Sequence, residues 1–148
     1  MSSLMNALKF KLHNLKRWLT ARLKIDALVT RLFHRFYYGA PAWRNTTWLG
    51  VTTLKCPLDL WIYQEMIWTI RPDVIIECGT ANGGSALYLA SMCDLVGQGQ
   101  IITVDIDAKP TRPKHPRVTY VSGSSTEPAV VAEVKKLVGD KKKCYCHT

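Results

Sequence analysis

Apolar residues recur at steps of three and four along the first forty residues, the spacing of an amphipathic helix. Leucines from Leu4 to Leu32 form this stripe, and lysines and arginines fill much of the other face. The pattern predicts a basic amphipathic helix over residues 3–37, within an N-terminal segment of residues 1–38. The stripe fits packing against protein, which we favour, and it also fits an anionic membrane surface.

A connector with several glycines and prolines follows at residues 39–57. Helical patterns then alternate with short β-branched runs. We expect helices at 58–70, 85–96 and 127–138, and strands at 74–76, 101–104 and 117–121. Short links in the order β-α-β-β-α predict an α/β fold with a doubly wound, parallel, Rossmann-like sheet over residues 58–148.

Each predicted helix has an apolar stripe that we expect to face the sheet. The stripe of the first helix comprises Trp61, Ile62, Met66, Ile67 and Ile70. That of the second comprises Leu87, Leu89, Ala90 and Leu95. That of the third comprises Val130, Val131, Val134, Leu137 and Val138. The third helix has two candidate starts, a Thr126 cap or a capping box of Ser124 and Glu127.

Charge is concentrated at the N-terminus. The chain carries a net charge of +9. Residues 1–40 hold eight lysines and arginines against Asp26, a surplus of seven. The basic charge therefore belongs to the N-terminal segment, and because that segment contains no recognisable nucleic-acid module, we expect no nucleic-acid partner.

The five cysteines are odd in number and irregularly spaced: Cys56, Cys78, Cys93, Cys144 and Cys146. This usage is typical of a reducing compartment, so we expect a cytoplasmic protein, with a peripheral membrane location if the N-terminal helix binds lipid. Cys144-x-Cys146-His147 could form a metal clip, but without a second ligand pair we expect no metal site. The sequence contains no run of eighteen consecutive apolar residues, so it predicts no membrane-spanning helix. No signal peptide is recognisable either.

A glycine-rich turn follows the first predicted strand and reads Glu77-x-Gly79-x-x-x-Gly83. Glycines let a ligand approach the backbone, and the helix N-terminus that follows offers free N–H groups. Glu77 could accept hydrogen bonds from a ligand's hydroxyl or ammonium groups. An ordinary strand-to-helix turn is the simpler alternative. The spacing resembles the first motif of S-adenosylmethionine (SAM) methyltransferases.

A second acid, Asp105, ends the next predicted strand about 20 residues after Gly84, the offset expected for a residue that binds a ribose. Several further motifs follow one another along the chain in the order that they have in the cephalosporin hydroxylase / rhamnosyl O-methyltransferase family. Together they resemble that family over about residues 43–140. They lie at residues 48–51, 55–65, 71–73, 77–85, 104–107, 115–116 and 122–126.

The resemblance implies a SAM-dependent methyltransferase that O-methylates a hydroxyl on a small molecule, glycan or glycolipid. It also implies that Asp105 contacts the SAM ribose and that Ser124 lies near the adenine. The remaining cofactor-binding residues would be Glu77, Gly79, Thr80, Gly83, Gly84 and Ser85. No catalytic residue is assigned, and a hydroxylase would need a redox cofactor for which the sequence offers no ligands.

The sequence departs from the family after Lys143. Family members continue into a fourth strand that closes with an Asp-Ser-Asp/Asn-His type motif, which supplies a divalent-metal ligand. Here the chain reads Cys144-Tyr-Cys-His-Thr148. We therefore expect the N-terminal half of such an enzyme, with three strands and no metal-ligand motif. Its apolar edge along 74–78 would be open and would invite self-association, unless the last five residues cover part of it. The alternative function is an inactive fragment that binds SAM or a partner chain.

Overall fold

The computed structural model describes residues 25–141 and 143–147, together with positions 9, 13, 14, 16 and 18. The chain divides into two compact units, residues 1–42 and residues 43–148. The leucines predicted to line the first part of the N-terminal helix lie outside the described residues. The five described positions before residue 25 are helical.

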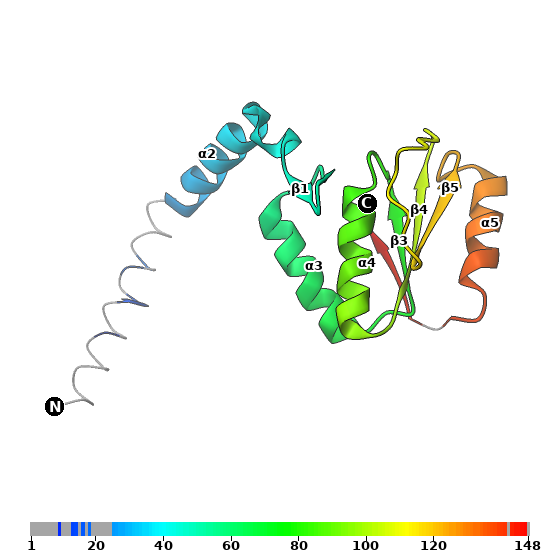
Figure 1. The fold of residues 1–148 in the computed structure, drawn as a ribbon. Coiled ribbons are helices and arrows are strands. Elements are labelled where there is room, and N and C mark those ends of the chain that lie inside the picture. Colours follow the sequence, from blue (N-terminus) through cyan, green and yellow to red (C-terminus); the bar gives the residue numbers. More distant parts are fainter. Residues whose placement is uncertain are drawn as a thin grey trace. The chain divides into compact units, whose positions relative to one another are not determined.

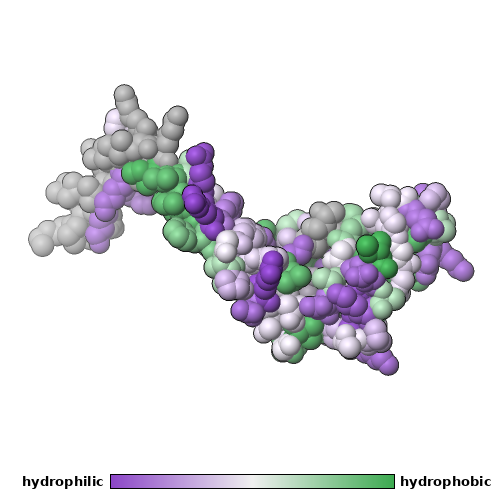
Figure 2. Space-filling model, turned by 90° about the horizontal axis from the view of Figure 1, so that it is seen from above, coloured by the Kyte–Doolittle hydropathy of each residue, from purple (hydrophilic) through white to green (hydrophobic). Residues whose placement is uncertain are grey.

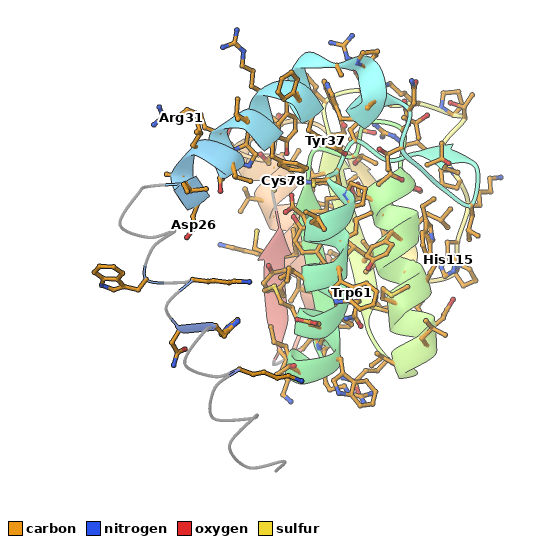
Figure 3. The ribbon with its side chains drawn as sticks, turned by 90° about the vertical axis from the view of Figure 1, so that its left-hand side faces the viewer. Asp26, Arg31, Tyr37, Trp61, Cys78 and His115 are labelled. Atoms are coloured by element: carbon orange, nitrogen blue, oxygen red, sulfur yellow. The ribbon has the colours of Figure 1, made fainter. Side chains whose placement is uncertain are left out.

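The first unit contains helix α2, Ile25–Gly39, which confirms the helical prediction for its described part. None of its residues is buried, and its apolar side chains include Leu28, Val29, Leu32 and Phe36. Figure 2 shows apolar and polar residues side by side along this unit. The rings of Phe33 and Tyr37, the latter labelled in Figure 3, stack with their centroids 5.5 Å apart.

The second unit is built on a parallel sheet with the strand order β5-β4-β3-β6. Its strands are β3 (Val74–Cys78), β4 (Gln100–Asp105), β5 (Val118–Ser122) and β6 (Cys144–His147). Helices α3 (Pro57–Ile70) and α4 (Gly84–Val96) cover one face of the sheet, and α5 (Pro128–Val138) covers the other (Figure 1). The doubly wound α/β prediction is confirmed.

Successive side chains along each strand point to opposite faces of the sheet and pack in two separate cores. Ile75 and Ile101 are fully buried against α3 and α4, where they meet Leu60, Ile67 and Leu89. The opposite core, beneath α5, comprises Val74, Ile102, Val104, Val121 and Val130. Central strands buried on both faces are typical of parallel sheets, and they account for the absence of polar alternation in the sequence.

The expectation of three strands was wrong, and residues 144–147 cover the edge of β3 that would otherwise be open. Strand β6 pairs in parallel with β3 from Val74 opposite Cys144 to Glu77 opposite His147. The Lys143 carbonyl also accepts hydrogen bonds from the N–H groups of Asp73 and Val74. Strand β3 therefore has a neighbour on each side, and the edge strands of the described sheet are β5 and β6.

The predicted connector contains regular structure. A short 3-10 helix, η1 (Pro41–Arg44), precedes an antiparallel hairpin of β1 (Thr47–Trp48) and β2 (Val51–Thr52). The Trp48 ring packs edge-on against Tyr88 of α4, and its indole N–H donates to Ser91 Oγ over 3.1 Å. The hairpin thus covers part of α4.

The predicted helix faces were right only in part. On α5, Val130 is buried and Val134 and Val138 pack against the same core. On α3, Trp61, Ile62 and Ile70 are exposed, and the buried residues are Leu60 and Ile67. Leu95 of α4 is 81% exposed because it lies on the outer side of the last turn, and Leu137 of α5 is also exposed. The predicted inward residues Leu87, Leu89 and Ala90 are buried.

The start of α5 also differs from both predicted caps. The N-cap is Glu127, without a side-chain capping hydrogen bond, and Pro128 occupies the first helical position. A proline there needs no N–H partner, so the helix can begin without a Thr126 or Ser124 cap.

Within the described residues, no helix is long and apolar enough to cross a membrane.

Candidate functional site

The carboxyl ends of β3 and β4 lie at one edge of the sheet, where Figure 3 labels Cys78, the last residue of β3. A turn over residues 79–83 leads from there into α4. Gly79 is exposed, has φ +94°, and has open space where a side chain would stand. Gly79, Asp105 and Ser124 line one cavity of about 180 Å³, together with Val104, Ile106, Gly123 and Ser125. Three of the predicted cofactor residues are therefore brought together.

Glu77 lies beneath this turn and is fully buried. Its Oε2 accepts a hydrogen bond from Thr103 Oγ1 over 2.7 Å, and Thr80 Oγ1 donates in turn to Thr103 over 2.6 Å. Burial raises the pKa of Glu77, and hydrogen bonds from Ser85 and Thr103 and the charges of Lys55 and Arg112 oppose that rise. Glu77, Thr80 and Ser85 thus form a buried polar layer that supports the turn.

Asp105 lines the cavity, and two backbone N–H groups hold its carboxylate. Its Oδ2 accepts the Ala81 N–H over 2.7 Å, and its Oδ1 accepts the Asp107 N–H over 3.0 Å. Burial acts to raise its pKa, but these N–H groups and the Arg112 charge outweigh burial, so the pKa of Asp105 is lowered. The carboxylate is therefore ionised at neutral pH, as an acceptor of hydroxyl hydrogen bonds should be.

Gly83 and Gly84 serve close packing. A Cβ on Gly83, where φ is +83°, would stand 2.9 Å from Pro113 Cδ. A Cβ on Gly84 would stand 2.3 Å from the Thr52 carbonyl oxygen. Neither glycine lines the cavity, and both let the start of α4 approach neighbouring segments.

Sequence reasoning missed two residues of this region. Arg112 is buried in the loop after β4, donates from Nε to the Ala81 carbonyl over 3.1 Å, and places a terminal nitrogen 3.2 Å from Asp105 Oδ2. Thr103 links Glu77 to Thr80. Thr103 was visible as the single polar residue of the predicted strand 101–104, whereas Arg112 gave no signal beyond its place between prolines.

Within the described part of the chain, no three or more histidines, cysteines or acids lie close enough together to hold a metal ion. Cys144 and Cys146 are exposed on β6, and Cys78 and Cys146 line a separate cavity of about 260 Å³ beneath α5. The polar groups at the carboxyl edge of the sheet are the Asp105 carboxylate, the Ser124 hydroxyl and the exposed backbone of Gly79. These groups fit a ribose-bearing ligand.

Comparisons with known proteins show what the chain is similar to. Residues 40–146 match the family model described as Rhamnosyl O-methyltransferase/CmcI. A rhamnosyl O-methyltransferase of Mycobacterium tuberculosis is 37% identical over 113 residues, which cover 74% of this chain and 46% of the relative. Its counterpart in Mycobacterium leprae is 36% identical over 108 residues, which cover 71% of this chain and 47% of the relative.

A solved structure is similar in fold as well. A CmcI structure described as Mg-SAM superposes with a TM-score of 0.53 at 27% identity, and the match covers 60% of this chain and 40% of CmcI. The chain spans about half the length of the curated relatives it matches.

Proposed function

Because the chain belongs to the Rhamnosyl O-methyltransferase/CmcI family, we propose that it binds SAM at the carboxyl edge of its sheet and serves O-methylation of a hydroxyl group. The observation that carries this proposal is the cavity shared by Gly79, Asp105 and Ser124. When bound, SAM would supply an activated methyl group. The names of the relatives favour a hydroxyl on a rhamnosyl glycan or glycolipid as the acceptor.

Each site residue has a proposed part in cofactor binding. The ionised Asp105 would accept hydrogen bonds from the ribose hydroxyls, and Ser124, across the same cavity, would lie beside the adenine. The exposed backbone of Gly79 would admit the cofactor close to the strand end. Glu77, Thr80 and Ser85 would hold the turn in place from below. A divalent metal stays outside the proposal, and the reducing cytoplasm is the proposed location.

Binding is tested with S-adenosylhomocysteine (SAH), the demethylated form of SAM. We expect amide signals of Gly79, Ala81, Asp105 and Ser124 to shift in nitrogen–proton NMR spectra when SAH is added to the whole chain. A folded chain whose spectrum SAH leaves unchanged would contradict the proposal. Methyl transfer from radiolabelled SAM to rhamnosides then tests the acceptor separately.

Asp105→Asn gives a sharper test because asparagine keeps the shape of the side chain and removes its charge. Hydrogen bonds to charged groups contribute about 1.5–3 kcal/mol, so the SAH dissociation constant should rise roughly tenfold or more. Asp107→Asn is the matched control, since the Asp107 side chain is exposed and only its backbone N–H contacts Asp105. Equal SAH affinity of the Asp105 variant and the wild-type chain, measured by calorimetry, would exclude the ribose role.

A further inference from the structure

We propose that Arg112 is a positioning residue of this site, which joins the glycine turn to Asp105 and orients the Asp105 carboxylate for the ribose. The inference rests on the proposed function and extends it to a residue that lies outside the recognised motifs. Its basis is a closed set of contacts among Ala81, Asp105 and Arg112.

The contacts hold Ala81 at both of its peptide groups. Its N–H donates to Asp105 Oδ2 over 2.7 Å, and its carbonyl accepts from Arg112 Nε over 3.1 Å. Arg112 closes the ring with a terminal nitrogen 3.2 Å from the same Asp105 oxygen. Ala81 has φ +48°, a conformation that a residue with a Cβ adopts only when its surroundings hold it there. The ring therefore fixes the strained centre of the turn.

The charge of Arg112 acts on two acids, the buried Glu77 and the partly buried Asp105. It lowers the pKa of Asp105, and with Lys55 it opposes the rise that burial imposes on the pKa of Glu77. The Arg112 side chain is 5% exposed and that of Asp105 is 14% exposed, so water screens this pair weakly. One guanidinium thus stabilises the ionised forms of both acids at the sheet edge.

The segment that carries Arg112 is itself anchored. Tyr120 of β5 donates from its hydroxyl to the Pro113 carbonyl over 2.7 Å, and its ring lies 5.8 Å from the Arg112 guanidinium carbon. The Arg112 N–H donates to the Lys109 carbonyl over 3.3 Å. The arginine therefore enters the site from a fixed backbone position, as positioning requires.

Two substitutions separate the charge of Arg112 from its forked shape. Arg112→Met removes both, so the Asp105 carboxyl should titrate at higher pH in carbon NMR of the ligand-free chain, and the SAH dissociation constant should rise on the order of 30-fold. Arg112→Lys keeps the charge but cannot reproduce the planar fork. Its Asp105 titration should stay near that of the wild-type chain, while SAH affinity still falls.

Arg117→Met is the matched control, because Arg117 is an arginine of the same loop whose partners are Asp94 and the Gly99 carbonyl. It should leave both the Asp105 titration and SAH binding unchanged. An Asp105 carboxyl that titrates identically in the Met variant and the wild-type chain would overturn the inference. Since this readout needs no ligand, it holds even if the wild-type chain fails to bind SAH, which would refute only the proposed function.

Discussion

Helices α3 and α4 are similar in length and in apolar content, yet they are buried to very different extents. Helix α4 buries eight residues, from Gly84 to Ala90 and Cys93, whereas α3 buries Leu60 and Ile67. Trp61 and Trp68 of α3 are 66% and 62% exposed. Figure 3 shows Trp61 on α3, with α4 beside that helix. The comparison teaches that apolar composition predicts a helix but does not predict which of its residues are buried.

The cause is the position of each helix in the fold. Helix α4 follows β3 directly, lies on the centre of the sheet, and is flanked by α3 and by the hairpin of β1 and β2. Helix α3 meets α4 and the sheet along one side only. A helix that is apolar all round buries only the faces that other elements cover.

The largest expected effect comes from the α4 side of this comparison. Leu89 is 3% exposed within the core, so Leu89→Ala removes packing and leaves a cavity. We expect the free energy of unfolding to fall by about 2–5 kcal/mol. Urea denaturation followed by circular dichroism measures this change, and a loss below about 1 kcal/mol would show that α4 is less tightly packed than described.

A smaller effect is expected at the junction of the two helices. The Tyr88 hydroxyl of α4 donates to the Leu60 carbonyl of α3 in a buried hydrogen bond. Tyr88→Phe keeps the ring and removes the donor, so the free energy of unfolding should fall by about 1 kcal/mol or somewhat more. An unchanged stability for Tyr88→Phe would mean that this bond does not join the helices.

The smallest effect is expected on the outer face of α3. Trp61 is mostly exposed and makes an exposed hydrogen bond of 3.2 Å to Glu65, so Trp61→Ala should change the free energy of unfolding by no more than about 0.5 kcal/mol. The same urea titration measures it. A loss similar to that of Leu89→Ala would indicate that the outer face of α3 is covered in solution.

Local patterns predicted most of the elements. The β-branched runs identified β3, β4 and β5, and the glycine turn located the start of α4 to within a residue. Family motifs led to Gly79, Asp105 and Ser124, which do share a cavity. These features depend on residues that are close in sequence, and such features are the ones that a single sequence records.

The errors concern features that depend on distant residues. Strand β6 has only four residues and no apolar pattern, and it forms by pairing with β3 some seventy positions earlier in the chain. Arg112 acquires its role from Ala81, 31 residues away. The hairpin turn uses Leu49 and Gly50, both with positive φ, in place of the usual Asn-Gly signal. Each of these features becomes visible only once the chain is folded.

The parallel pairing of β6 with β3 has a practical consequence for handling the protein. Because the two strands run in the same direction, β6 approaches the edge of the sheet that carries Gly79 and the candidate cavity. A purification tag or fluorescent fusion placed directly after β6 would start at that edge and compete with a ligand for access. Binding measurements should therefore use a protein that carries no tag directly after β6.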